Sequence, residues 1–198
     1  MTRVLRRLLL LAVLGGTWLA AAMAQSALTI RPLAEKTVDA LPGGVLFWRI
    51  ENLPSLDAAR AAAGPFSVAA ESGGKAWLFT LGPAGGTTPG ATRVAEVGPI
   101  ARVQAAKYLL RINDASGAPG STTPVHSHPG SEAFYVLAGE QSVRGAEGTL
   151  RVQAGQAEPG RGAGAPMQVS SSGAGELHAL VMFVVDADKP FSAPAVLP

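Results

Sequence analysis

Three side chains that can bind a divalent metal ion stand close together in the sequence: His126, His128 and Glu132. Because side chains alternate between the two faces of a strand, both imidazoles leave the same face. The Pro-Gly-Ser segment at residues 129–131 can turn the chain and bring the carboxylate of Glu132 back toward them. Two neutral imidazoles and a carboxylate match a 2-His-1-carboxylate site. The spacing therefore predicts a centre for iron, manganese, nickel or zinc.

The residues after Glu132 predict the surroundings of that centre. Phe134 and Val136 share the face of Glu132 in an alternating strand, so we expect them to form an apolar pocket beside the metal. An apolar pocket strengthens the electrostatic effect of the ion on a bound ligand. A His-x-His pair alone is more commonly a solvated strand pair, so the wider pattern has to decide between the two interpretations.

That wider pattern is present. Five residues separate Gly120 from His126, three separate His128 from Glu132, and six separate Glu132 from Gly139. The whole segment, GSTTPVHSHPGSEAFYVLAG, resembles the first motif of the cupin superfamily at every motif position. The resemblance implies a small jelly-roll barrel with the two histidines and Glu132 as metal ligands inside it.

The second cupin motif, G-x5-P-x-G-x2-H-x3-N, is altered at its metal ligand. The matching segment here is GQAEPGRGAGAPMQVSSSG. Aligning Gly164 with the motif glycine puts Met167 at the His position and Ser171 at the Asn position, so the fourth imidazole is missing. A Met ligand would favour a soft ion such as copper(I), although Met at an apolar barrel position is more often a core residue.

Three hypotheses follow from the altered motif. A three-ligand site would keep more coordination positions open for water and substrate. Alternatively, the barrel has given up tight metal binding and holds an organic ligand alone. In the third hypothesis, His178 on the next strand replaces the missing imidazole; that strand is apolar on both faces, so alternation does not say which way His178 points.

The rest of the chain predicts an all-β fold. Short segments rich in β-branched and aromatic residues alternate with Gly/Pro-rich turns, as in a sandwich or barrel. Ser55 can cap one short helix over residues 56–63, and residues 25–43 are expected to be loop-rich. Arg111 is expected to face solvent rather than to bind an anion inside the barrel. The predicted strands are residues 45–50, 67–70, 76–81, 92–97, 108–113, 123–128, 133–138, 141–144, 150–153, 166–170 and 177–185.

We therefore predict a cupin-type jelly-roll barrel whose core spans residues 106–186. A strand-rich N-terminal extension of the barrel, with the one helix, precedes it at residues 25–105, and an extended tail follows at residues 187–198. Residues 1–24 are typical of a signal peptide, with the basic segment MTRVLRR, the apolar run LLLLAVLGG and the cleavage pattern Ala22-Met23-Ala24. We expect a secreted or periplasmic protein that starts at Gln25 and has no membrane association after cleavage.

Charge and composition restrict the partners. The net charge is +2, and Arg3, Arg6 and Arg7 account for the excess, because the remaining chain has 13 cationic and 14 anionic residues. Nucleic acid is therefore not an expected partner, since phosphate binding requires clustered cations. The absence of cysteine excludes disulfides, thiolate metal sites and a cysteine nucleophile.

The expected function is that of an exported cupin-like protein that binds a divalent metal and a small molecule in its barrel. If the protein is an enzyme, the metal would bind an oxygen-bearing substrate as a Lewis acid or activate dioxygen, as in a metal-dependent oxidoreductase such as a dioxygenase. The resemblance to cupins also allows an isomerase or a decarboxylase, and the sequence does not choose among them. The alternative is a non-catalytic barrel that binds or stores a small molecule without tightly bound metal. A third class is a structural or interaction protein, since cupins often dimerise through sheet edges, with a homodimer as its candidate assembly.

Overall fold

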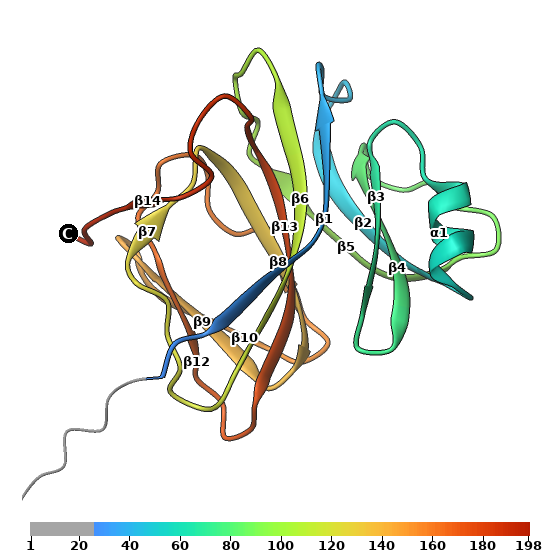
Figure 1. Cartoon of the computed structure of the whole chain (residues 1–198). Helices are drawn as coiled ribbons and strands as arrows, with labels where there is room; N and C mark the ends of the chain where they lie inside the picture. The colour runs from blue at the N-terminus through green and yellow to red at the C-terminus, as the bar shows by residue number, and fades with distance from the viewer. Residues whose placement is uncertain (1–25) are drawn as a thin grey trace, which may run out of the picture.

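The computed structural model describes residues 26–198, and within them all regular secondary structure except one short helix is β-strand (Figure 1). The predicted signal peptide and its cleavage site lie outside the described residues. In residues 26–198, no helix is both long enough and apolar enough to cross a membrane.

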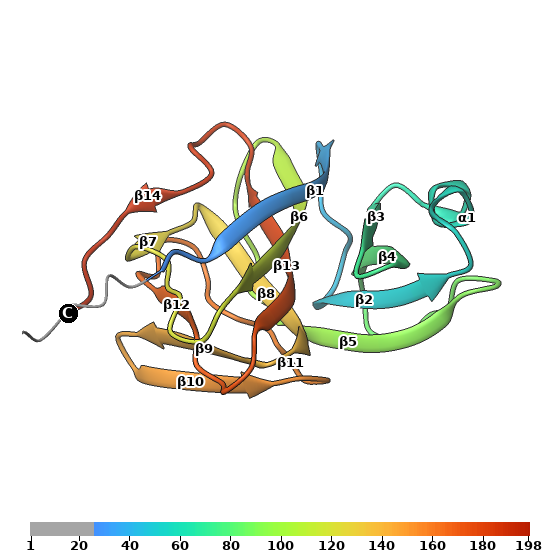
Figure 2. The ribbon, with the colours of Figure 1, turned by 60° about the horizontal axis from the view of Figure 1, so that its bottom comes forward.

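The barrel is built from two sheets and a short strand pair, on opposite sides of a common interior (Figure 2). The five-stranded sheet runs β1 (Thr29–Val38), β6 (Tyr108–Gly117), β13 (Leu177–Asp186), β8 (Gly130–Ala138), β11 (Ala157–Glu158). The three-stranded sheet runs β10 (Gly148–Gln153), β9 (Glu140–Gly145), β12 (Gln168–Ser171). The strand pair is β7 (His126–Ser127) with β14 (Ala193–Pro194), and a bridge from His126 to Met167 joins it to the segment that enters β12.

A third sheet covers the outside of the barrel. It runs β3 (Ser67–Ser72), β4 (Lys75–Gly82), β2 (Leu46–Leu53), β5 (Thr92–Ile100) and carries the helix α1 (Leu56–Ala62). The sequence predicts that this part of the chain extends the barrel, but these strands form their own sheet beside it (Figure 1). The helix begins as predicted, because the Ser55 side chain accepts a hydrogen bond from the Ala58 amide at 3.1 Å.

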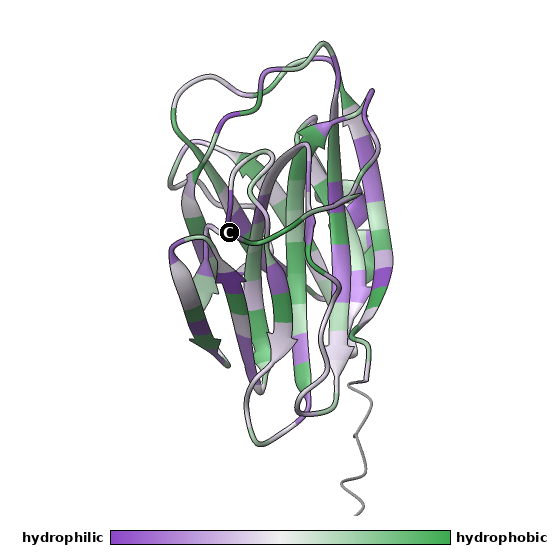
Figure 3. Cartoon of the chain, turned by 90° about the vertical axis from the view of Figure 1, so that its left-hand side faces the viewer, coloured by the Kyte–Doolittle hydropathy of each residue, from purple (hydrophilic) through white to green (hydrophobic). Residues whose placement is uncertain are grey.

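Strand β13 lies between two hydrophobic cores, which explains why it is apolar on both faces. Ala179, Val181 and Phe183 point into the barrel interior. The alternate residues Leu180 and Met182 pack into a second core between the five-stranded sheet and the four-stranded one, where Trp48, Trp77 and Phe79 are fully buried. Hydrophobic residues accordingly run along the central strands, whereas hydrophilic bands interrupt the outer ones (Figure 3).

The sequence predicts a loop over residues 25–43, but most of this segment forms strand β1. Most of its residues are exposed or half-buried, so it lacks the apolar alternation that marks a strand. It is a strand because its backbone pairs with β6 at the edge of the five-stranded sheet, with a bulge between Pro32 and Ala34. Tertiary pairing, rather than side-chain pattern, sets its conformation.

Candidate metal centre

The structure brings the three predicted ligands together. His126 lies on β7, His128 directly follows that strand, and Glu132 lies near the start of β8. One ligand atom from each of the three lies within 4.8 Å of the others. The Nε2 of His128 is 3.8 Å from Oε2 of Glu132. Two atoms that each lie about 2.0–2.2 Å from one ion are separated by at most about 4.4 Å, so this pair can share an ion.

The Nδ1 atoms of both imidazoles are engaged by main-chain carbonyls. The Nδ1 of His126 lies 2.8 Å from the carbonyl oxygen of Pro124, and the Nδ1 of His128 lies 2.7 Å from that of Phe191. A carbonyl oxygen only accepts hydrogen bonds, so each Nδ1 carries the proton. The proton-free Nε2 of each ring is then available to a metal, which is how histidine ligands are usually held in metal sites.

Glu132 is buried without a partner. Its side chain is 6% exposed, and Oε2 makes no hydrogen bond within the described chain. Burial raises the pKa of Glu132 to about 7. Burial likewise lowers the pKa of His128 to about 4; the Phe191 carbonyl opposes this, and the nearby charges of His126 and Arg111 add to it. At neutral pH, His128 is therefore uncharged and does not form an ion pair with Glu132.

These features fit a divalent cation. A buried carboxylate oxygen without a partner destabilises the fold. A cation bound between this oxygen and the two neutral Nε2 atoms would provide the missing partner. His126, His128 and Glu132 would hold the ion, which would act as a Lewis acid toward an oxygen-bearing ligand.

Two glycines keep β8 close to its neighbours where it carries Glu132. Gly160 adopts φ +72°, and a Cβ at this position would overlap the carbonyl oxygen of Glu132. A Cβ on Gly130 would overlap the carbonyl oxygen of Val184 on β13. Only glycine permits such backbone approach, so both positions fix where the carboxylate stands.

Met167 lies beside His126. The two residues exchange both backbone hydrogen bonds, at 2.9 and 2.8 Å, and directly paired residues of antiparallel strands project to the same face. The Met167 side chain is 1% exposed and packs in the barrel interior with Phe134 and Val136. Its register therefore agrees with the alignment that puts Met167 at the fourth-ligand position.

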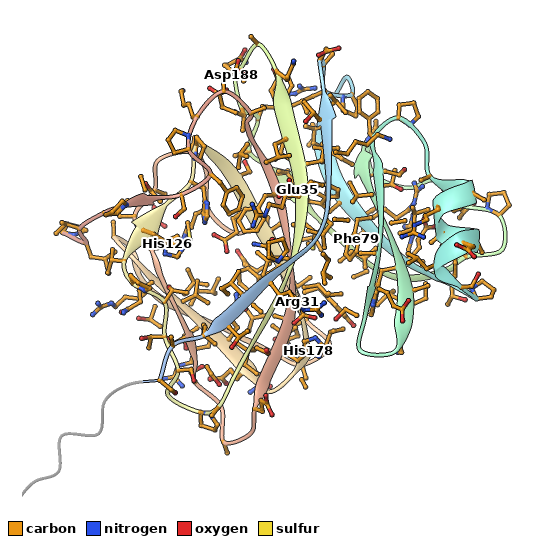
Figure 4. The ribbon with its side chains drawn as sticks, viewed as in Figure 1. Arg31, Glu35, Phe79, His126, His178 and Asp188 are labelled. Carbon is orange, nitrogen blue, oxygen red and sulfur yellow. The ribbon has the colours of Figure 1, made fainter. Side chains whose placement is uncertain are left out.

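His178 is not near the predicted ligands, which corrects the hypothesis that it replaces the fourth imidazole. Its Nε2 lies 2.9 Å from Oδ2 of Asp114 and 3.1 Å from Oγ of Ser72. Asp114 also contacts Arg31, and Figure 4 shows His178 beside Arg31 and far from His126. The reason is alternation along β13: Leu177 and Ala179 face the barrel interior, so His178 between them lies on the outer face with Leu180.

A cavity of about 460 Å³ opens beside the centre. Phe134 and Val136, predicted to line the metal pocket, are instead packed in the barrel core and do not reach the cavity wall. The apolar wall comes from other residues, chiefly Val181, Phe183 and Phe191.

The sequence prediction for Arg111, which lies in the polar wall of the cavity, is also wrong. Arg111 faces this cavity rather than solvent, with its guanidinium carbon 4.0 Å from the centre of the Phe191 ring.

Sequence reasoning missed three parts of this cavity. Gln141 of β9 and Asn113 of β6 are both buried and line it. Alternation from the apolar Val143 would have placed Gln141 inside the barrel. The tail around Phe191 carries no comparable signal, because its position depends on pairing between β14 and β7.

A family model described as "Cupin domain" matches residues 116–157, the part of the chain that contains His126, His128 and Glu132. This chain contains a cupin domain. The barrel is accordingly a jelly-roll β-fold. The comparison with curated proteins found no match to this chain.

Several solved structures share limited similarity with the cupin chain. A cupin superfamily protein from Desulfitobacterium hafniense is 17% identical, with 39% of this chain and 68% of that chain covered and a TM-score of 0.35. A Thermus thermophilus protein is 31% identical over 39% of this chain and 73% of that chain, with a TM-score of 0.36. A DMSP lyase from Ruegeria pomeroyi is 22% identical, with 43% of each chain covered and a TM-score of 0.38.

Proposed function

We propose that the cupin domain binds one divalent first-row metal ion through His126, His128 and Glu132, and performs metal-dependent chemistry on a small oxygen-bearing molecule in the adjacent cavity. A metal-dependent oxidoreductase such as a dioxygenase is the preferred class. The observation that carries the proposal is the buried, unpartnered carboxylate of Glu132 facing an imidazole whose other nitrogen is already bonded.

The cavity supports a role in binding small molecules. Its volume of about 460 Å³ lies in the range of small-molecule sites, and its walls are mostly apolar with a few polar groups. Three protein ligands leave coordination positions free for a substrate, which is typical of catalytic rather than structural metal sites.

A non-catalytic binding barrel is the second candidate, and Met167 favours it. A thioether stands where the cupin pattern has an imidazole, so the site has one strong ligand fewer. In that case the cavity would bind its organic ligand with no tight requirement for metal.

Metal titration separates the two candidates. We expect the wild-type chain to bind one manganese(II), iron(II), nickel(II) or zinc(II) ion in calorimetry, and both His128→Ala and Glu132→Gln to lose most of that binding. His178→Ala is the matched control, because it removes a histidine outside the centre and should leave metal binding unchanged. Wild-type binding no tighter than about 1 mM for all four ions would refute the metal-dependent function. Oxygen consumption by the iron-loaded chain with organic acids then tests the dioxygenase class.

We further propose that the mature protein is exported, on the strength of the basic segment, apolar run and Ala-x-Ala pattern at its N-terminus.

A further inference from the structure

Gln141 is a buried carboxamide that the protein leaves unsatisfied. The residue is 0% exposed, and both Oε1 and Nε2 lack a hydrogen-bond partner within the described chain. A buried amide without partners is destabilising by more than a hydrogen bond contributes, so such groups are rare unless something else binds them. Gln141 lines the same cavity as the candidate metal ligands.

Two more polar side chains enter this cavity from the opposite sheet. Asn113 and Arg111 lie on β6 of the five-stranded sheet, whereas Gln141 lies on β9 of the three-stranded sheet. The Nε of Arg111 donates to Oδ1 of Asn113 at 2.8 Å, and Nη1 contacts Glu35 at 3.0 Å. A molecule in the cavity would thus lie between a cationic wall and the Gln141 amide.

The charges of the cavity favour an anion. Apart from the histidines, Arg111 and Glu132 are the only ionisable residues that line it in the described chain. A divalent ion bound by two neutral imidazoles and the Glu132 carboxylate retains one positive charge, and Arg111 adds another. The Glu35 partner of Arg111 is 46% exposed, so solvent screens its opposing charge.

The Gln141 amide indicates which polar group the ligand carries. Its Nε2 donates and its Oε1 accepts, and one hydroxyl group can satisfy both because it also donates and accepts. We infer that Gln141 is a specificity-determining residue, and that the ligand of this cavity is a small organic anion carrying a hydroxyl group that bonds to the Gln141 carboxamide. Val181, Phe183 and Phe191 would contact its carbon skeleton. This inference rests on the proposed metal-dependent function of the same site.

The test uses three pairs of acids that differ only by a hydroxyl group: lactate and propionate, mandelate and phenylacetate, salicylate and benzoate. Binding of each is measured by calorimetry to the metal-loaded full chain. We expect the hydroxy acid of at least one pair to bind tenfold or more tightly than its partner, about the effect of one lost hydrogen bond to a buried group. We expect Gln141→Met to abolish that preference while the bound metal stays constant.

Gln168→Met is the matched control. Gln168 donates to the Thr123 carbonyl at 3.1 Å and does not line the cavity, so its replacement should preserve the hydroxyl preference. Equal binding within all three pairs, or a preference that survives Gln141→Met, overturns the inference and leaves the metal site intact. Failure of the wild-type chain to bind metal would instead refute the proposed function on which it rests.

Thermal unfolding provides a readout that needs neither ligand nor metal. Replacing an unpaired buried amide by an isosteric apolar side chain should raise the unfolding temperature of ligand-free protein by about 2–4 °C. A fall would show that the Gln141 amide already has a bonded partner in the ligand-free protein, such as a trapped water, and would overturn the inference. Gln141→Leu provides a second apolar variant should the Met variant fold poorly.

Discussion

The main-chain carbonyl of Phe191 holds the ring of His128: its oxygen lies 2.7 Å from Nδ1, and the two aromatic rings pack with their centres 4.8 Å apart. Phe191 lies in the C-terminal tail, far from His128 in sequence. The same tail pairs β14 with β7 and lines the cavity at Ser192 and Ala193. The tail therefore sets the tautomer of a candidate metal ligand and forms part of the wall of its cavity.

Removing the tail should weaken metal binding. A chain that ends at Lys189 loses the carbonyl that fixes His128, and partners of this kind typically change metal affinity about 10–100-fold. Titration of this variant with manganese(II) or zinc(II) provides the measurement. A chain that ends at Ala195 is the control, since it retains Phe191, β14 and the bond from the Ala195 amide to the Val125 carbonyl at 3.2 Å. Equal affinities of the two truncated chains would contradict the role of Phe191.

Met167→His should tighten metal binding. Its backbone pairs directly with His126, so an imidazole there would project to the side of the centre. A gain of about tenfold or more is expected from the added ligand. Met167→Leu is the control and should bind like the wild type if the thioether only fills the core. A loss of copper(I) binding alone in that variant would show instead that the sulfur is a ligand.

Metal affinity should increase with pH up to about 7 and then level off. Burial raises the pKa of Glu132 to about 7, so below that pH a metal ion must displace a proton from the carboxyl group. Each unit of pH below the pKa then reduces the apparent affinity by about tenfold. His128 adds no slope near neutrality, because burial lowers its pKa to about 4 and it is already neutral. Affinities measured from about pH 5.5 to 8.5 test this, and a flat profile would disagree with it.

The mature protein should begin at Gln25. Cleavage after the Ala22-Met23-Ala24 pattern removes the basic and apolar segments. N-terminal sequencing of the protein recovered from the medium or the periplasm measures the cleavage site. Replacing Ala24 by a bulky residue, as in Ala24→Leu, should slow processing. Recovery of intact chains from Met1 in the cytosol of the native organism would argue against export.

The sequence alone determined the class of fold and the three residues that the structure brings together. Period-two patterns depend on neighbouring residues, so most strands and the Ser55-capped helix could be predicted locally. The spacing of His126, His128 and Glu132 is also local, because one turn and two short strands are enough to bring them together. The jelly-roll barrel itself was predicted from the resemblance to the cupin motif and not from local patterns.

Only the tertiary structure decided how the rest of the chain meets this site. Strand β1 is a strand because it pairs with β6. The separate outer sheet packs on a second core along β13. The sequence of β13 shows that both of its faces are buried, but not which part of the chain covers the second face. His178 falls on the outer face because its neighbours Leu177 and Ala179 pack into the barrel, and Arg111 on the inner one because its neighbours Leu110 and Ile112 pack outward. The position of Phe191 against His128 depends on contacts between segments distant in sequence, which no local pattern encodes.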